Sequence, residues 1–322
     1  MNRSVAFALL AAALFGASTP FAKLLVGNMP PVLLAGLLYL GSGLGLTMIR
    51  LVRDRGWQAS GLTRAEWPWL LGAIFFGGVA GPVALMFGLM TTSGASASLL
   101  LNLEAVLTAV IAWVVFKENA DKRIVLGMAA IVAGGLVLSW PTQTTRAVNW
   151  LGPVLVGVAC LCWAIDNNLT RKVSASDALF IASSKGMVAG LANTLLAFSL
   201  GATVPSAVTT LETMAVGLLG YGFSLVMFVL ALRGLGTART GAYFSTAPFV
   251  GALMALVVLG ESAGPQFWIA ALLMAVGVWL HLTEKHAHEH EHGPLDYEHT
   301  RTHGTVRHSH DHFPDVHHRH GH

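Results

Sequence analysis

Two stretches of the chain, 143 residues apart, share one pattern. Residues 93–118 read SGASASLLLNLEAVLTAVIAWVVFKE, and residues 236–261 read GTARTGAYFSTAPFVGALMALVVLGE. They align without a gap: each begins with small residues and Ser or Thr, continues through a long apolar run, and ends at an acidic residue, Glu118 or Glu261. Self-similarity at a fixed separation predicts that the chain is built from two copies of one unit.

The composition around these stretches is that of a membrane protein. Of the 322 residues, 54 % are hydrophobic and only 11 % are charged, whereas an average soluble domain carries about 25 % charged residues. Ten of the charged residues fall after residue 284, so the rest of the chain is poorer still. So few charges could not cover the surface of a water-soluble globule, which excludes an ordinary cytoplasmic enzyme. No run of Lys and Arg indicates nucleic-acid binding, and Cys160 and Cys162 lie within an apolar run that implies no disulfide framework.

Ten apolar runs are long enough to cross a bilayer, since a helix needs about 20 apolar residues to span a core about 30 Å thick. The chain is therefore expected to be an all-α membrane protein with ten transmembrane helices. We read the first run as a retained helix, because it exceeds signal-peptide length and lacks a cleavage site. The expected spans are residues 5–26, 31–52, 67–90, 93–116, 123–140, 151–171, 178–200, 211–232, 236–259 and 264–283.

The distribution of basic residues predicts that both termini are cytoplasmic, because short cytoplasmic loops carry an excess of Lys and Arg. If the N-terminus is inside, only Lys23 and Arg146 lie at outer connections. The inner connections hold Arg50, Arg53, Arg55, Arg64, Lys117, Lys122, Arg123, Arg171, Lys172, Arg233 and Arg239. We therefore expect a multi-pass protein of the inner (plasma) membrane.

Each copy of the repeat holds five spans, and five is an odd number. The second copy must then enter the membrane from the opposite face, which gives two inverted five-helix repeats. The match continues to Gly134 and Gly277, and a weaker one joins residues 14–23 to 162–171. Inverted repeats related by an in-plane pseudo-twofold axis place a substrate site near the bilayer midplane, where the halves meet.

These features resemble the EamA-type permeases of the drug/metabolite transporter superfamily. The resemblance rests on ten spans in two halves, on Phe15-Gly16 and Trp163-Ala164 in the first span of each half, and on the acidic end of each fourth span. It covers residues 4–281 and implies a first EamA-like five-helix repeat at 4–140 and a second at 151–283. It also implies a secondary transporter, often an exporter, of amino acids or other small metabolites.

The sequence departs from the family pattern in the first fourth span. The family commonly has a proline near the middle of this helix, as Pro248 in the second half, whereas the first half has Asn102-Leu103-Glu104-Ala105. Because a charge at the bilayer centre is costly, Glu104 must face a cavity or a partner. We expect it to contact substrate or protons, with a structural hydrogen bond or an ion pair to Lys185 as the alternative.

Other polar residues inside the spans are candidates for the same pathway. Asp166, Asn167 and Asn168 are consecutive in the sixth span, so at about 100° per residue they cannot all face one direction. Lys185 lies about two turns inside the seventh span, where it pairs with Asp166 or Glu104, attracts an anion, or snorkels to the interface. Asn102 precedes Glu104 by two positions and is included as a pathway candidate.

Four aromatic residues complete the predicted substrate and proton pathway. Tyr243 and Phe244 occupy the stretch of the ninth span that matches Asn102 and its neighbours, and Phe15 and Trp163 mirror each other in the two first spans. They would form walls for an apolar or aromatic solute, and plain packing is the alternative for each.

From Lys285 onward the chain is rich in His and poor in apolar residues, so we expect a disordered cytoplasmic tail over residues 285–322. Closely spaced neutral imidazoles suit Zn, Ni, Co or Cu. The candidate metal ligands are His286, His288, His290, His292, His308, His310, His312, His317, His318, His320 and His322.

The function expected from the sequence is export of a small organic metabolite such as an amino acid, by alternating access at a midplane cavity. The alternative is transport of a divalent transition metal or its complex, with the tail as metal sensor or buffer. An enzyme is not expected, because no nucleophile–base pair is recognisable, and no nucleotide-binding loop is present. No cofactor is required. The expected partners are the solute, the lipid bilayer and, as an open alternative, a second copy in a homodimer, but no nucleic acid.

Overall fold

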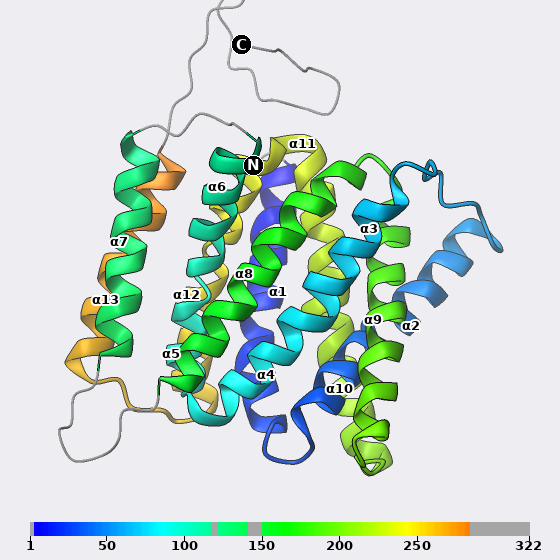
Figure 1. Cartoon of the computed structure of the whole chain (residues 1–322), viewed down its shortest axis with the longest axis horizontal. Coiled ribbons are helices and arrows are strands. Elements are labelled where there is room, and N and C mark those ends of the chain that lie inside the picture. The colour runs from blue at the N-terminus through cyan, green and yellow to red at the C-terminus, as the bar shows by residue number, and fades with distance from the viewer. Residues whose placement is uncertain (1–2, 117–121, 141–149, 284–322) are drawn as a thin grey trace, which may run out of the picture.

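The computed structural model describes residues 3–116, 122–140 and 150–283, and every regular element in these ranges is a helix. Figure 1 shows these helices side by side in one bundle, with their axes running in roughly the same direction. They correspond to the ten predicted spans and form an all-helical membrane protein. Some spans consist of more than one helical element.

The first half holds five spans. The third is built from three consecutive elements and the fourth from two. The elements are α1 (Arg3–Leu25), α2 (Pro31–Asp54), α3 (Trp67–Ala73), the π-helix η1 (Ile74–Ala80), α4 (Gly81–Thr91), α5 (Gly94–Leu100), α6 (Leu103–Phe116) and α7 (Lys122–Ser139).

The second half repeats this arrangement, except that one helix runs on from the eighth span into the ninth. The elements are α8 (Leu151–Val173), α9 (Ala178–Ser199), α10 (Ala207–Gly217), the π-helix η2 (Leu218–Phe223), α11 (Ser224–Phe244), α12 (Ala247–Val258) and α13 (Pro265–Leu282).

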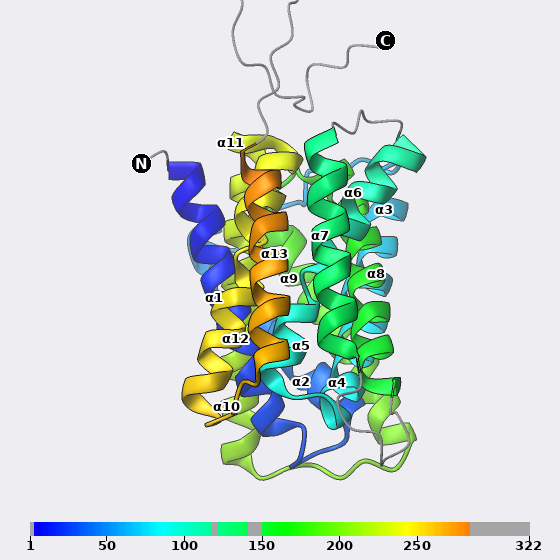
Figure 2. The same ribbon diagram turned by 90° about the vertical axis from the view of Figure 1, so that its left-hand side faces the viewer.

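Eight of the spans are by themselves long and apolar enough to cross a membrane. The other two, α7 and α13, contain shorter apolar stretches and pack against each other along their length, as Figure 2 shows. Gly134 of α7 lies against Met274, and Gly277 of α13 lies against Ile131. These two contacts are equivalent under the shift of 143 residues, so this helix pair obeys the repeat.

One end of the bundle, here named the N-face, is the end at which α1 begins. Ser4 near the start of α1 lies against Gly234 of α11. At the same end the Arg233 Nε donates a hydrogen bond to the carbonyl oxygen of Ser174, which follows α8, at 3.1 Å. The first helix of the first half therefore begins where the first helix of the second half ends.

The other end, here named the opposite face, gives the complementary result. The Lys23 Nζ near the end of α1 donates to the carbonyl oxygen of Thr92 at 2.9 Å, and Gly152 near the start of α8 lies against the side chain of Thr92. Helices α1 and α8 thus run in opposite directions. The two halves are inverted, as the odd number of spans per half predicts.

Irregularities of the helices also repeat. The π-helices η1 and η2 fall at equivalent positions of the third and eighth spans. The fourth span breaks between α5 and α6, and the ninth breaks between α11 and α12, again at equivalent positions. The spans predicted over 93–116 and 236–259 are thus each interrupted between two helical elements.

Side chains at each break explain why the helix stops there. The Asn102 Nδ2 donates to the carbonyl oxygen of Leu99 at 3.0 Å, and the Ser245 Oγ donates to that of Gly241 at 2.8 Å. Such bonds offer the backbone carbonyls a partner other than the helical N–H groups. The break in the ninth span is followed by Pro248 in the first turn of α12, a position that proline favours.

The acidic residue that ends the second copy of the repeat has a structural role. Both oxygens of Glu261 accept hydrogen bonds at the start of α5, from the backbone N–H of Gly94 at 2.7 Å and of Ala95 at 2.8 Å. A carboxylate there satisfies free N–H groups and complements the positive end of the helix. Glu261 therefore joins the second half to the first. Its counterpart, Glu118, lies outside the described residues.

Helices α2 and α9 cross where two equivalent glycines meet. Gly43 and Gly186 are 143 residues apart, and a Cβ on Gly43 would lie only 2.3 Å from the backbone nitrogen of Met187. A Cβ on Gly186 would lie 2.4 Å from the nitrogen of Gly43. Because the two equivalent residues touch each other, the pseudo-twofold axis passes through this contact. Small residues let helices in a membrane approach this closely.

This close crossing predicts that adding a methyl group destabilises the protein at Gly43 and not at Gly157. Gly43→Ala should lower the free energy of unfolding by about 1–3 kcal/mol, because the backbones of α2 and α9 must move apart. Gly157→Ala in α8 is the matched control, since a Cβ there meets nothing within 4 Å. Thermal unfolding of the purified variants in detergent measures the difference. Equal melting temperatures for the two variants would contradict the close crossing.

Candidate functional site

A cavity lies between the two halves and contains about 580 Å³ of atom-free space, including space that opens outward. Its described lining comes from seven spans. Three belong to the first half, through α1, α2 and the start of α6, and four to the second half, through α8, α9, η2 with the start of α11, and the end of α11. It is lined by Phe15, Tyr39, Ser42, Glu104, Trp163, Asp166, Asn167, Ala182, Lys185, Gly186, Gly220, Tyr221, Ser224, Leu225, Phe228 and Phe244.

The lining residues extend from the middle of the bundle toward the N-face. Phe15 and Tyr39 lie near the middle of α1 and α2, while Asp166 and Asn167 lie in the part of α8 that ends at the N-face, and Lys185 in the part of α9 that begins there. Within the described residues α6 does not pack extensively against α11 or α12. Toward the opposite face, α5 packs among α1, α8 and α12 and fills the space.

The π-helix η1 positions two aromatic side chains of the cavity. The carbonyl oxygen of Gly77 accepts hydrogen bonds from the Tyr39 hydroxyl at 2.6 Å and from the Trp163 Nε1 at 3.0 Å. The next carbonyl, of Gly78, accepts from the Asn193 Nδ2 at 3.0 Å. A π-bulge alters the regular hydrogen-bond pattern of the helix, and such bulges are frequent at functional sites. Here three neighbouring helices take up the carbonyl groups.

An ion pair lies at the base of the cavity. The Lys185 Nζ is 2.5 Å from Asp166 Oδ1 and 2.7 Å from Asp166 Oδ2, and it also contacts the Thr170 hydroxyl at 3.1 Å. Both charged residues are buried, with 2 % of Lys185 and 7 % of Asp166 exposed. Gly77 makes room for the carboxylate, because a Cβ there would lie 1.9 Å from Asp166 Oδ2. The two charges cancel each other.

Glu104 is the third charged group of the cavity and lies in the first turn of α6, directly after the break in the fourth span. Its Oε1 accepts a hydrogen bond from the Asn167 Nδ2 at 2.8 Å, and this amide also lies 3.4 Å from the Thr108 hydroxyl. Among the described residues no Lys, Arg or His forms an ion pair with Glu104. The positive end of α6 stabilises a carboxylate in this position.

Aromatic rings line the cavity around Phe15. Its ring centroid is 5.6 Å from that of Trp163, 5.8 Å from Tyr221 and 5.4 Å from Phe244. The wall continues from Tyr221 to Tyr39 at 5.4 Å, and from Phe244 to Phe228 at 5.0 Å. These separations are typical of favourable aromatic pairs. We name these six residues the aromatic wall.

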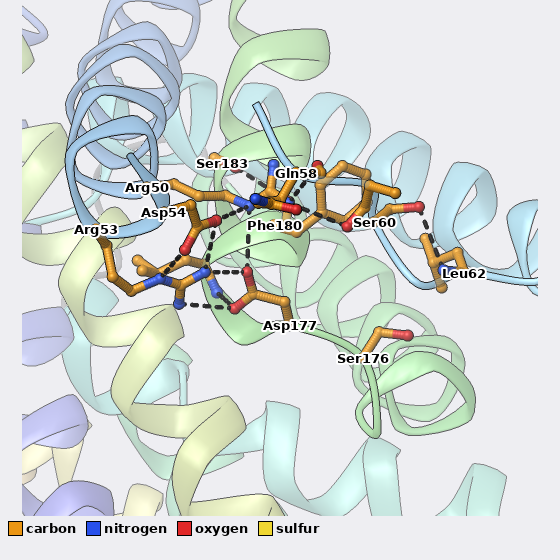
Figure 3. A network of polar contacts seen from close by, with 12 residues as sticks. Arg50, Arg53, Asp54, Gln58, Ser60, Leu62, Ser176, Asp177, Phe180 and Ser183 are labelled. Atoms are coloured by element: carbon orange, nitrogen blue, oxygen red, sulfur yellow. Dashed lines mark hydrogen bonds and ion pairs between the residues drawn. The ribbon is translucent and has the colours of Figure 1, made fainter. Parts of the chain in front are cut away.

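A second charged network ties α2 to α9 at the N-face (Figure 3). Arg50 is only 4 % exposed and lies 3.2 Å from Asp177, with its guanidinium 5.0 Å above the Phe180 ring. Arg53 bridges Asp177 and Asp54. Burial alone would raise the pKa of Asp177, but hydrogen bonds from Arg53 and Arg50 hold this pKa below its usual value. Asp177 also caps α9, so the network fixes the ends of two helices that line the cavity.

Seven of the nine pathway residues expected from the sequence line this cavity, and two lie elsewhere. The Asn102 side chain is occupied at the helix break and lies against the sulfur of Met274 at 3.7 Å. Tyr243 packs with Ala8 and Leu235. The seven that line the cavity are Phe15, Glu104, Trp163, Asp166, Asn167, Lys185 and Phe244.

The sequence analysis did not identify some residues that line the cavity, although a sequence pattern indicates them. Tyr39 precedes Ser42 by three positions in the second span, and Tyr221 precedes Ser224 by three positions in the eighth. Residues three apart share one face of a helix. Two Tyr-x-x-Ser pairs in apolar runs of different halves would have indicated a shared polar and aromatic surface.

The predicted metal ligands of the tail, His286 through His322, lie outside the described residues. Within residues 3–116, 122–140 and 150–283, no group of three or more His, Cys, Asp and Glu side chains could hold a metal ion. The cavity itself has two carboxylates, and one of them is already paired with Lys185.

Comparisons with known proteins agree with this architecture. The model of the EamA-like transporter family matches residues 2–140 and again residues 150–283. An uncharacterized transporter of Methanothermobacter thermautotrophicus is 25 % identical over 281 residues, which cover 83 % of this chain and 82 % of the relative. The uncharacterized transporter YyaM of Bacillus subtilis is 26 % identical over 277 residues, covering 82 % and 88 %.

A protein of known crystal structure shares the fold. It superimposes with a TM-score of 0.67 over 86 % of this chain and 94 % of that chain, at 18 % sequence identity. The two matches of the family model separate at the connection between α7 and α8, where the inverted halves meet in the chain.

The ion pair predicts that a single substitution at Lys185 is more destabilising than a double substitution that also neutralises Asp166. Lys185→Met should destabilise the protein by about 3–5 kcal/mol, because it leaves the Asp166 carboxylate buried without a partner. Adding Asp166→Asn should recover most of this loss, since the second change removes the unpaired charge. Melting temperatures of the purified single and double variants in detergent test this. A single variant as stable as the wild type, or no recovery in the double variant, would argue against the pair.

Proposed function

Because the chain belongs to the EamA-like transporter family, a family of membrane transporters without enzymatic activity, we propose that it is a secondary transporter of a small organic metabolite. The cargo would occupy the cavity between the inverted halves, which alternates between the two faces of the membrane. Amino acids are the class that the family resemblance suggests first.

The observation that carries the proposal is the Glu104 carboxylate. It is 9 % exposed, lies at a helix break inside the bundle, lines the cavity and forms no ion pair within the described residues. Ionisable groups at this depth are expensive and commonly mark substrate or ion pathways. Helix breaks that line a cavity are also typical of substrate sites in transporters built from inverted repeats.

The sequence and the position of the cavity also support a proposal for the energy source and the direction of transport. The sequence contains no nucleotide-binding loop, so an ion gradient or the gradient of the solute itself would drive transport. With both termini cytoplasmic in an inner membrane, the N-face would be the cytoplasmic face. The cavity extends toward that face and would receive its cargo from the cytoplasm, which supports export.

Transport of a divalent transition metal is the alternative, and it depends on the His-rich tail. Among the described residues that line the cavity, Glu104 is the one acidic side chain without an ion pair, and none is His. Soft and borderline metals prefer imidazole and thiolate ligands. We therefore place metal binding, if it has a role, on residues 285–322 as a sensor or buffer and not on the transport path.

Loss of the Glu104 charge should abolish transport or uncouple it from a proton gradient while the protein still folds. Glu104→Gln keeps the side-chain size and removes the charge. Proteoliposomes screened with labelled amino acids, amines and divalent metals, with and without an imposed pH gradient, measure the effect. Glu212→Gln, at an exposed position of α10, is the control. Normal flux that still responds to pH in the Glu104 variant would refute its role.

Removal of residues 285–322 separates the two cargo classes. If the cargo is organic, flux of that solute through the truncated protein should equal that of the full chain, and metal tolerance of the cells should not change. Metal tolerance and uptake of labelled solute, measured in the same strains, provide the comparison. Reduced tolerance together with lost metal flux in proteoliposomes would favour the metal alternative.

A further inference from the structure

The charge balance of the cavity is unequal. Its lining contains three charged side chains, Glu104, Asp166 and Lys185. Lys185 is held by both oxygens of Asp166 and by the Thr170 hydroxyl. The remaining carboxylate, of Glu104, receives one hydrogen bond from the neutral amide of Asn167. When Glu104 is ionised, the described lining therefore has one excess negative charge, and an opposite charge is strongly favoured beside it.

The aromatic wall faces the same space and has the same electrostatic preference. The rings of Trp163, Tyr221 and Phe244 each lie 5.4–5.8 Å from the ring of Phe15, centroid to centroid. The faces of aromatic rings attract cations, and quaternary ammonium groups are recognised in proteins by cages of such rings. The wall and Glu104 therefore favour the same kind of group, a cation with an apolar body.

A carboxylate on the cargo would lack a cationic partner in this cavity. The one ammonium of the described lining, Lys185, is already paired with Asp166, and no other Lys, Arg or His lines the cavity among the described residues. The Tyr221 hydroxyl is a neutral donor without a partner in the described part of the chain, so a negative group on the cargo would leave water and lie near Glu104 with no opposite charge to compensate it, which is costly.

From this arrangement we propose that the cargo is an organic monocation without a carboxylate, an amine with an apolar or aromatic body, held between Glu104 and the aromatic wall. This narrows the proposed transport function and rests on it. Glu104 and the aromatic wall line the same cavity, so one small molecule can contact both. The ammonium group neutralises Glu104, and the apolar body packs against the rings.

Three compounds that share a phenylethyl group test the proposal on the full-length protein in detergent. Phenethylamine carries only the ammonium, phenylalanine carries the ammonium and a carboxylate, and 3-phenylpropionate carries only the carboxylate. We expect phenethylamine to bind, phenylalanine to bind roughly tenfold or more weakly, and 3-phenylpropionate to give no signal in isothermal titration calorimetry. Equal or tighter binding of phenylalanine, or no binding of phenethylamine at millimolar concentration, would overturn the proposal.

Substitutions test separately whether Glu104 and the aromatic wall bind the amine. Glu104→Gln should lower the affinity for phenethylamine roughly tenfold or more, whereas Glu104→Asp keeps the charge and should keep the preference for the amine over the amino acid. Phe15→Leu should weaken binding of the amine by removing a ring from the wall. Glu212→Gln, outside the cavity, should bind like the wild type. Unchanged binding of phenethylamine by the Glu104→Gln variant would contradict the proposal.

The outcomes separate this inference from the transport proposal beneath it. If proteoliposomes carry phenylalanine or another zwitterion in a manner that depends on Glu104, while phenethylamine neither binds nor is transported, the cargo class is wrong and transport stands. If the reconstituted protein moves no organic solute at all, the transport proposal fails. Flux of phenethylamine without flux of phenylalanine would support both.

Discussion

The cost of ionised groups inside a bilayer governs the arrangement of this protein. A charge at the membrane centre costs about 2.5–3.5 kcal/mol on the most lenient scale, and the bundle contains three such groups around one cavity. Asp166 and Lys185 offset each other at 2.5 Å, and Gly77 leaves space for that pair. Glu104 has the amide of Asn167 and the end of α6 instead of a counter-ion. The chemistry of the cavity follows from this difference.

The two halves repeat each other in backbone and differ in chemistry. Both the fourth and the ninth spans break at the same place, and both the third and the eighth contain a π-helix. Where the first half has Glu104-Ala105 after its break, the second has Ala247-Pro248. In the cavity, the first half therefore contributes a carboxylate without a counter-ion, Glu104, and the second half contributes four of the six residues of the aromatic wall.

The sequence was sufficient for the number and inversion of the spans and for most of their limits, because long apolar runs and an odd number of spans per repeat leave few alternatives. It did not indicate that one helix runs from the eighth span into the ninth. It did not locate the breaks, at which Asn102 and Ser245 bond to carbonyls of the preceding turn. Nor did it predict the π-helices; in η1 the carbonyls of Gly77 and Gly78 accept side-chain bonds from other helices. The breaks involve local side-chain bonds and η1 involves tertiary contacts, and hydrophobicity encodes neither.

The site was predicted unevenly for a related reason. A charge in an apolar run is conspicuous, and Glu104, Asp166 and Lys185 were found that way. Asn102 is polar too, but its amide closes the helix end on Leu99 and does not reach the cavity. Tyr39 and Tyr221 were overlooked because a tyrosine among leucines and glycines reads as packing until its neighbours are known.

The contact between Gly43 and Gly186 has a mechanical consequence. A point on the pseudo-twofold axis maps onto itself when two related halves exchange shapes, so the groups meeting there need not separate. The crossing of α2 and α9 can therefore serve as the fulcrum of a rocking motion, with the largest displacements at the helix ends far from it. Bulk added at this position would act on the hinge itself and not on either gate.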